Sequence, residues 1–391
     1  MTEPIIVIGA GISGLALGQG LRKHSIPFRI FGRDERLDSR AQGYRFRLSD
    51  QGVQTLEESL DARQYQRFLD CCCTRDAPES NVPSLIVDAL TGEVAKPLFQ
   101  QGARAPVGGD TVILSVDRSA ARRVLLEGIE HHVQFGRGFK SFEEHDSIIN
   151  VTFNDGSIAQ GCALVGADGV SSRIGRYEAR LIFGKAELRG EVERVFSSPA
   201  RSGLRLIRAS QQNCLVETMR FNPEQPQVPL DYVYWVLFMR KDQYLPDHEL
   251  LSLEPSGIFR LAQRFSGDWH DDFKLLFTSG HAHASVLRIL TEKPGTIPLA
   301  LDEGSRVTLI GDAGHAMAPT AALGATTALA DVGILVGRLL EHGGLGRCTA
   351  AFRAYESTMK EHAAAALEKS LLGGRAVFGM KPFAELPMVE V

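Results

Sequence analysis

The sequence predicts an α/β fold in which an inserted mixed β-sheet interrupts a parallel-sheet domain and helices form the C-terminal part. An aliphatic run at residues 5–8 stops at clustered glycines, and apolar residues at helical spacing follow it. Residues 183–285 are rich in strand-forming residues. Ala, Leu and charged residues then recur at helical spacing from Ala322 to about Leu340, and again from Thr349 to Leu372. We therefore expect the chain to begin with a strand and to end with two helices.

The first thirty-odd residues have the pattern of a βαβ unit. Residues 5–8 are all aliphatic, as in a parallel strand that is buried on both faces. Leu17 and Leu21 lie at helical spacing after it, and Ile26 begins a second apolar run that ends at Phe31. This order predicts two neighbouring parallel strands joined by a helix.

The turn between the first strand and the helix carries the pattern G-x-G-x-x-G. Gly9 permits the tight turn, Gly11 lets the backbone approach a phosphate, and Gly14 lets the helix pack on the strand. The N-terminus of the helix adds the positive end of its dipole. Together with Ser13, these residues predict a pyrophosphate site in a Rossmann-like domain. The alternative is a glycine-rich turn that holds no ligand.

The end of the second strand departs from this pattern. A carboxylate is expected there to bind ribose hydroxyls, but the sequence has Gly32, followed by Arg33, Asp34 and Glu35. Losing one charge-assisted hydrogen bond weakens binding by about ten- to a hundredfold. We expect a weakened dinucleotide site in which Asp34 substitutes for the missing acid.

Composition and charge exclude several other classes of protein. The 391 residues exceed one compact core, so we expect two domains or one domain with a large insertion. A net charge of −4 argues against a nucleic-acid partner, and no window reaches the roughly 18 apolar residues of a membrane span. The six Cys form no C-x-x-C pair, no metal-ligand spacing is present, and no leader pattern precedes the first strand. These features predict a cytoplasmic protein without a metal, either a monomer or a homodimer.

Two distant segments narrow the choice of dinucleotide. Residues 165–173, VGADGVSSR, resemble the "DG" fingerprint of flavoprotein hydroxylases, and residues 309–319, LIGDAGHAMAP, resemble their "GD" fingerprint. With the glycine turn at 9–14, they occur in the order and at the separations usual in that family. Nearly the whole chain thus resembles the single-component, FAD-dependent aromatic-ring hydroxylases and epoxidases, the para-hydroxybenzoate hydroxylase-like family.

The resemblance implies a glutathione-reductase-type FAD domain and a role for individual residues. Asp312 would bind the ribityl or pyrophosphate part of FAD, Arg118 would contact its phosphate, and Asp168 would brace the domain and help NAD(P)H to interact. Asp168 is otherwise a structural cap. Arg45 and Arg47 lie where the family has basic residues near the nucleotide, and the alternative for them is a solvated strand face. The cofactor-binding residues implied are Gly9, Gly11, Ser13, Gly14, Arg33, Arg45, Arg118, Asp168, Gly311, Asp312, Gly324 and Ala325.

The third fingerprint also departs from the family. After Pro319 and Thr320 the family has a glycine-rich run and then an Asn, whereas this chain has Ala321, Ala322 and Thr326. A Cβ at a position that needs positive φ costs about 1 kcal/mol or more and moves the backbone away from a nearby ring. Flavin contact is therefore expected to be weaker here than in the family.

The resemblance also divides the chain. The FAD domain would comprise residues 1–75, 100–182 and 286–391, and the substrate-binding sheet domain would comprise residues 76–99 and 183–285. Side chains on the inserted sheet are the pocket candidates, namely Arg205, Arg208, Arg220, Tyr232, Tyr234, Trp235 and Met239; each is otherwise packing or surface.

The function implied is that of an FAD-dependent monooxygenase of secondary metabolism. It would hydroxylate or epoxidise a mostly apolar aromatic or polycyclic small molecule with NADPH or NADH and O2, through a C4a-hydroperoxyflavin, because the cofactor carries the difficult chemistry. The first alternative is a family member that binds FAD weakly or not at all and catalyses a non-redox cyclisation or isomerisation, or simply binds a small ligand. A reductase or dehydrogenase of the same fold is the second.

Two other site types are disfavoured by the residues. His281 and His283 have i, i+2 spacing with no nearby Cys or carboxylate, which favours a strand face over a metal site. The halogenase signature W-x-W-x-I-P is missing, since the chain has two tryptophans, Trp235 and Trp269.

Overall fold

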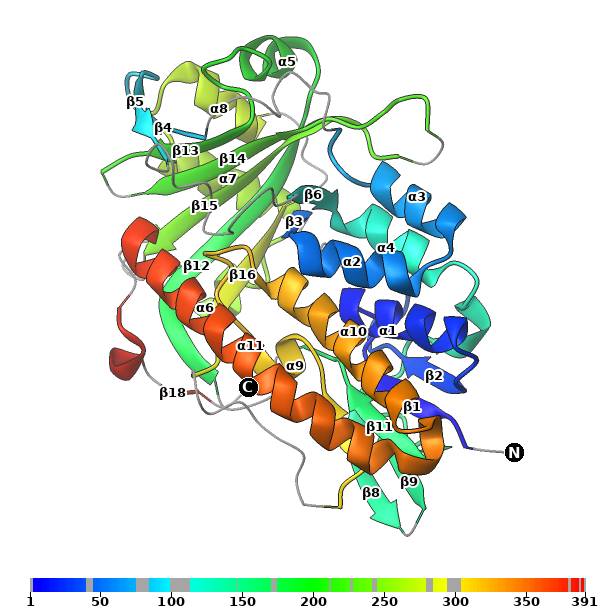
Figure 1. The fold of residues 1–391 in the computed structure, drawn as a ribbon. Coiled ribbons are helices and arrows are strands. Elements are labelled where there is room, and N and C mark those ends of the chain that lie inside the picture. The colour runs from blue at the N-terminus through cyan, green and yellow to red at the C-terminus, as the bar shows by residue number, and fades with distance from the viewer. Residues whose placement is uncertain are drawn as a thin grey trace.

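The structure is a computed structural model in which residues 3–39, 45–74, 84–98, 113–145, 147–169, 174–210, 212–225, 228–240, 245–278, 284–293, 304–378, 381–386 and 388–389 are described. A parallel sheet with its helices forms one part of the molecule, and a large mixed sheet forms the other (Figure 1). The predicted α/β fold class is confirmed.

The parallel sheet has the strand order β17-β11-β1-β2-β7, and every neighbouring pair in it is parallel. Its strands are β1 (Ile5–Ile8), β2 (Phe28–Phe31), β7 (Val133–Gln134), β11 (Ala163–Gly166) and β17 (Val307–Leu309). The central strand β1 is fully buried, as its aliphatic sequence requires. Three segments that are far apart in the sequence therefore end at one edge of this sheet.

Helices and a small sheet cover the two faces of the parallel sheet. The helices are α1 (Ile12–Lys23), α2 (Asp50–Ser59), α3 (Ala62–Asp70), α4 (Arg118–Leu126), α10 (Gly324–Glu341) and α11 (Cys348–Phe378), with short 3-10 turns at Glu130–His132 and Gly344–Arg347. The other face packs on the antiparallel strands β8 (Phe139–His145), β9 (Ile148–Phe153) and β10 (Ile158–Gly161). The expected C-terminal helices are α10 and α11.

The large sheet has the order β16-β12-β15-β14-β13-β4-β5, and β18 adds to β12. Its strands are β4 (Leu85–Asp88), β5 (Val94–Pro97), β12 (Ile174–Glu187), β13 (Leu204–Arg208), β14 (Asn213–Met219), β15 (Tyr232–Arg240), β16 (Ala284–Thr291) and β18 (Met388–Val389). The sheet is mixed, because β13 and β4 are parallel whereas the other neighbouring strands of the sheet are antiparallel.

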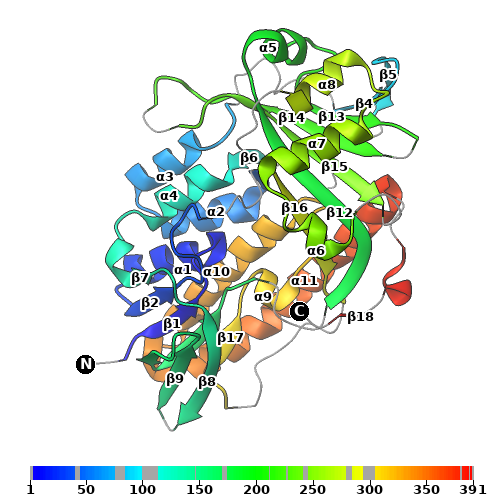
Figure 2. The ribbon, with the colours of Figure 1, turned by 180° about the vertical axis from the view of Figure 1, so that it is seen from behind.

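The two faces of the large sheet have different neighbours. One face packs on helices that include α7 and α8, which lie on the side turned away from α10 and α11 (Figure 2). These outer helices are α5 (Gly190–Phe196), α6 (Asp247–Leu250), α7 (Pro255–Phe265) and α8 (Asp271–Thr278). The other face is directed toward α9 (Asp312–His315), the short pair β3 (Arg45–Leu48) and β6 (Leu114–Asp117), and the 3-10 turn Phe383–Glu385. This inner face is the one that meets the dinucleotide domain.

The strands β12 and β16 extend past the boundaries expected at residues 182 and 286. Each is a continuous strand of the large sheet on both sides of its boundary. We therefore propose that the sheet domain reaches outward to residues 174 and 291. The segment 85–97 pairs within this same sheet through β4 and β5.

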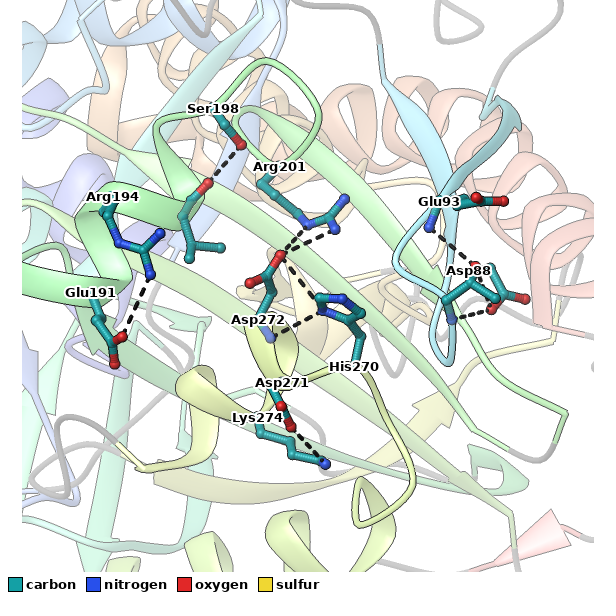
Figure 3. Close-up of polar contacts among 12 residues, drawn as sticks. Asp88, Glu93, Glu191, Arg194, Ser198, Arg201, His270, Asp271, Asp272 and Lys274 are labelled. Carbon is teal, nitrogen blue, oxygen red and sulfur yellow. Dashed lines mark hydrogen bonds and ion pairs between the residues drawn. The ribbon is translucent and has the colours of Figure 1, made fainter.

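A cluster of polar contacts lies at the end of the large sheet where α5, α8, β4 and β5 are found (Figure 1), and Figure 3 shows it in close-up. Arg201 donates to Asp272 Oδ2 over 3.2 and 3.3 Å, and the Asp272 backbone N–H donates to His270 Nδ1. Asp88 caps the turn between β4 and β5 by accepting from the backbone N–H groups of Leu90 and Thr91. These contacts join α8 and the strand connections at this end, so we assign them to the fold.

Candidate functional site

The glycine turn after β1 contains two glycines that the fold requires and one that it does not. Gly9 has φ +124°, and a Cβ there would lie 2.1 Å from the Ala167 carbonyl oxygen. A Cβ on Gly14 would lie 1.9 Å from the Gly9 carbonyl oxygen. Gly11 has ordinary extended backbone, and apart from Gly11 and its two chain neighbours no atom of the described residues lies within 4 Å of a Cβ built on it. Gly11 thus leaves open space beside the first turn of α1, where a phosphate can approach the helix N-terminus.

The three fingerprints meet at this turn. Strand register aligns Ile8 with Gly166 and Gly166 with Leu309, so the segments that follow β1, β11 and β17 leave the sheet at the same edge. Ala167 contacts Gly9, and Gly311 lies against the side chain of Ser13. This is the edge at which parallel α/β sheets bind their ligands.

Two aspartates lie at this edge of the sheet, one from the second fingerprint and one from the third. Asp168 and Asp312 both have exposed side chains. Desolvation nevertheless raises the pKa of each carboxyl group, and it outweighs the opposing effects of Arg33 on Asp168 and of His315 and Arg118 on Asp312. Both fingerprints therefore place an acid at this edge of the sheet, beside the turn.

Arg118 is close enough to Asp312 to interact with it electrostatically. Desolvation lowers the pKa of the guanidinium and Asp312 opposes this effect. The Nε atom of Arg118 is buried and has no hydrogen-bond partner among the described residues. Together with the open space at Gly11, this unsatisfied donor fits the phosphate of a dinucleotide.

The missing carboxylate at the end of β2 has a packing explanation. A Cβ on Gly32 would lie 3.0 Å from the Ala10 Cβ and 3.3 Å from the Phe135 ring. The direction in which an acidic side chain would extend is thus filled by the protein itself. Arg33 is exposed next to it, and the use of Asp34 in place of the acid stays a prediction.

Arg122 is a residue of this site that sequence reasoning missed. It lies buried in α4 and donates to the Ala10 carbonyl oxygen over 3.0 Å and to the Leu37 carbonyl oxygen over 2.7 Å. It therefore ties the glycine turn to the segment after β2. Arg122 and Arg123 are adjacent cations in the sequence, so the sequence carried no signal to tell the buried one from the other.

Arg45 and Arg47 of β3 are enclosed, so the solvated strand face is wrong for them. Both side chains form ion pairs with Glu217 of β14, the Arg47 contact being 2.7 Å, and Ser115 Oγ donates to the same carboxylate. Burial alone would raise the pKa of Glu217, but the two arginines lower it to about 2. The Arg45 guanidinium also lies 5.0 Å from the centre of the Tyr234 ring. This cluster joins the two domains.

Asp117 forms a second link between the domains. It caps α4 by accepting from the Ala120 backbone N–H, and it accepts from Lys185 Nζ over 2.6 Å and from the Tyr232 hydroxyl over 2.9 Å. The residue after it is Arg118. The large sheet thus holds the start of the helix that carries the predicted phosphate contact. Glu217, Asp117 and Lys185 were all missed, because each acquires its role from a partner at least 68 residues away.

The pocket candidates on the large sheet divide between its two faces. Tyr232 and Tyr234 are on the inner face, where the cluster of apolar side chains includes Ala318 of the third fingerprint. Trp235 and Met239 are on the outer face, and the Trp235 ring packs edge-on against Phe277 of α8. Side chains alternate along a strand, so adjacent residues lie on opposite faces. Trp235 and Met239 are therefore core residues and not pocket residues.

Two of the three arginines among the pocket candidates form hydrogen bonds or ion pairs with the segments that connect the strands. Arg205 is buried and donates to the carbonyl oxygens of Pro199 and Ala200. Arg220 donates to Ser197 Oγ and pairs with Asp231. Arg208 is exposed at the end of β13. The side chains of Arg205 and Arg220 therefore stabilise connections between strands, and these two residues are withdrawn as pocket candidates.

The loop after the third fingerprint contains the strain that its sequence predicts. Ala322 has φ +54°, a conformation that glycine adopts more easily. Thr326 is buried, and its Oγ1 accepts from the Ser49 backbone N–H. Gly324 and Ala325 begin α10, and a Cβ on Gly324 would meet Met317 at an ordinary 3.6 Å. His281, His283, residues 170–173 and residues 43–44 lie outside the described residues.

Replacing Ala322 with glycine is expected to raise the free energy of unfolding by up to about 1 kcal/mol, because it removes the Cβ from a left-handed position. Thermal or urea unfolding measures the change. The control is Ala354→Gly inside α11, which should lower the free energy of unfolding by about 1 kcal/mol. A loss of stability in Ala322→Gly would show that the left-handed backbone at this position carries no cost.

The comparisons with known proteins agree with this geometry. No family model matches the chain. The dual O-methyltransferase/FAD-dependent monooxygenase elcB of Phaeosphaeria nodorum is 30% identical over 99% of this chain and 47% of its own length. The FAD-dependent monooxygenase phnB of Penicillium herquei is 24% identical over 100% of this chain and 95% of its own. The crystal structure of Klebsiella pneumoniae HpxO complexed with FAD and uric acid has a TM-score of 0.71 at 19% identity, covering 95% of this chain and 88% of that one.

The fold and the three converging fingerprints define the class of flavoprotein-type α/β proteins. Nearly the whole chain is similar in sequence to FAD-dependent monooxygenases, and its fold is similar to that of HpxO. The chain spans about half the length of its dual-function relative. Among the described helices, none combines the length and the apolar character needed to cross a membrane.

Proposed function

We propose that this chain binds FAD and is a monooxygenase that hydroxylates or epoxidises a mostly apolar aromatic or polycyclic small molecule of secondary metabolism. The observation that carries the proposal is the convergence of Gly11, Asp168 and Asp312 on one edge of the parallel sheet. The names of the relatives support the same reaction type.

The residues of this edge would divide the cofactor between them. The open first turn of α1 at Gly11 would receive the pyrophosphate, and Arg118 would place a positive charge on it. Asp312 would bind the ribityl or pyrophosphate region, and Asp168 with Arg33 would border the opposite wall. When bound, FAD supplies electron transfer from NADPH or NADH and the activation of O2.

The inner face of the large sheet would bind the substrate. Its side chains are mainly aliphatic and aromatic, which suits an apolar ring system and excludes water from it. Partly buried members of this face are Cys73, Leu215, Val228, Phe238, Leu371 and Phe383. The charged groups that border the face are already paired, as Arg45 and Arg47 are with Glu217 and Lys185 is with Asp117. Such a surface favours an uncharged substrate.

We also propose that the protein acts in the cytoplasm as a monomer or a homodimer.

The visible spectrum of the purified protein is the first test. We expect it to show bound flavin, or to acquire a flavin spectrum when FAD is added. NADPH and NADH should then each be tried in an oxygen-uptake assay with neutral phenolic aromatics, and one of these compounds should stimulate uptake and gain one oxygen atom by mass spectrometry. Protein that stays colourless and takes up no added FAD would refute the proposal.

The strained loop favours a second candidate. Gly32, Ala321, Ala322 and Thr326 replace residues that contact FAD in the family, and Ala322 does adopt positive φ. A protein that has lost tight flavin binding could use the same apolar face for a cyclisation, an isomerisation or ligand binding. Flavin that co-purifies in one-to-one ratio with the protein decides against this candidate. Turnover that continues without O2 would instead indicate a reductase or dehydrogenase.

A further inference from the structure

One face of α11 contacts the third fingerprint at regular intervals along the helix. The Tyr355 hydroxyl donates to the Leu309 carbonyl oxygen over 2.8 Å, at the end of β17. Ser370 Oγ donates to the Ala318 carbonyl oxygen over 2.5 Å, in the loop that follows. His362 lies between them, seven residues after Tyr355 and eight before Ser370, so all three are on the same side of the helix. The fingerprint is thus held by the C-terminal helix as well as by its own sheet.

His362 reaches the fingerprint through one buried carboxylate. Its Nε2 atom lies 2.9 Å from Oδ1 of Asp331, a fully buried residue of α10. The other oxygen, Oδ2, accepts from the Gly311 backbone N–H over 2.7 Å and lies 2.6 Å from His315 Nε2. Asp331 therefore joins α11 to the residue immediately before Asp312.

Both ring nitrogens of His362 lie within hydrogen-bond distance of an oxygen atom. Nδ1 lies 3.1 Å from the Thr358 carbonyl oxygen, and Nε2 faces the Asp331 carboxylate, so both ring nitrogens face acceptors. Burial alone would raise the pKa of Asp331, but His315 and His362 together lower it. The buried carboxylate of Asp331 thus lies between a histidine of α9 and a histidine of α11.

Gly311 needs a partner that fixes its peptide. It has φ +60° and ψ −142°, and a Cβ there would lie 3.1 Å from the Ala328 Cβ and 3.2 Å from Ser13 Oγ. This conformation is open to glycine, which also has the largest conformational freedom to lose. The bond to Asp331 is what fixes the direction of the Gly311 N–H, and with it the position from which Asp312 extends.

We propose that His362 is a positioning residue of the dinucleotide site: by donating to Asp331 it holds the Gly311 N–H, and so sets Asp312 in the geometry that receives the cofactor. The inference rests on the proposed binding of FAD. It adds a contribution from α11, which supports the loop that here has alanines in place of the family's glycines. Among the described residues, Asp331 without His362 keeps His315 and Gly311 as its hydrogen-bond partners and gains the freedom to rotate away from the turn.

The experiment compares two substitutions at one position. His362→Leu removes the donor, whereas His362→Gln keeps an N–H at about the reach of Nε2 and is expected to restore most of the function. The control is His24→Gln, an exposed histidine at the end of α1. Hydrogen–deuterium exchange of a peptide covering residues 308–316 is measured in the protein without flavin, together with the FAD dissociation constant from flavin fluorescence and the melting temperature.

We expect His362→Leu to speed exchange in residues 308–316 and to raise the FAD dissociation constant, each by about ten- to a hundredfold, with exchange elsewhere unchanged. Equal exchange in the wild type and His362→Leu overturns the proposal, as does a Gln variant that is no better than Leu. If wild-type protein binds no FAD, the exchange result still tests the role of His362, whereas the proposed function fails. If His362→Leu does not fold, Asp331→Asn provides the same comparison with little change of shape.

Discussion

Replacing Gly11 with valine is expected to leave the fold intact and to abolish flavin binding. Apart from Gly11 and its two chain neighbours, no atom of the described residues lies within 4 Å of a Cβ at this position, and the backbone there is extended, so a side chain can begin here without a clash or backbone strain. Its methyl groups would occupy the space beside the first turn of α1 that the pyrophosphate needs. The FAD dissociation constant should rise by at least about a hundredfold, while the free energy of unfolding changes by about 1 kcal/mol or less.

Flavin fluorescence titration and urea unfolding measure these two quantities on the same preparation. Gly9→Ala is the matched control in the same turn, because φ +124° and a Cβ 2.1 Å from the Ala167 carbonyl oxygen are incompatible with folding of this segment. It should lower stability strongly, whereas Gly11→Val should not. Wild-type FAD affinity in Gly11→Val would mean that the turn does not hold the pyrophosphate.

Replacing Glu217 with glutamine is expected to lower the free energy of unfolding at pH 7 by roughly 3 kcal/mol. The substitution keeps the side-chain size but leaves the enclosed guanidinium groups of Arg45 and Arg47 without an anion between them. The lowered pKa of about 2, against 4.5 for the free side chain, corresponds to a stabilisation of the same order. The effect is measured by urea unfolding of both proteins.

The difference in the free energy of unfolding between the wild type and Glu217→Gln should depend on pH in a definite direction. The folded state lowers the pKa of Glu217, so its contribution is fully present above about pH 4.5 and is lost as the pH falls toward about 2. The gap in stability between the wild type and Glu217→Gln should therefore shrink as the pH is lowered below about 4.5. Glu143→Gln on the exposed strand β8 serves as the control and should change little. A gap that stays constant with pH would show that the ion pairs contribute nothing.

The parts of the fold that sequence predicted are those in which neighbouring residues carry the signal. The aliphatic run before Gly9 predicted β1, and the helical spacing after Ala322 predicted α10. The positive φ required at Gly9 and tolerated by Ala322 followed from the residues that the family has in those turns. In each case local backbone preference and apolar periodicity agree with the final structure, so a short window of sequence was sufficient.

The pocket candidates could not be sorted from the sequence. Trp235 and Tyr234 are adjacent on β15, and both were candidates with packing or surface as the alternative, yet the pleat puts them on opposite faces. Arg205 was a further candidate, and it binds the carbonyl groups of a nearby turn. Periodicity divides a strand into two faces, but it does not tell which face meets which neighbour.

The sequence by itself determined the α/β class, the glycine turn and the order of three fingerprints, because these depend on residue types at short spacing. Only the tertiary structure decided that Gly11 lies beside open space, that Glu217 pairs with Arg45 and Arg47, and that His362 reaches Gly311 through Asp331. These contacts join segments as much as 172 residues apart in numbering, between positions 45 and 217. Their geometry follows from how the sheets and helices pack, which no local pattern records.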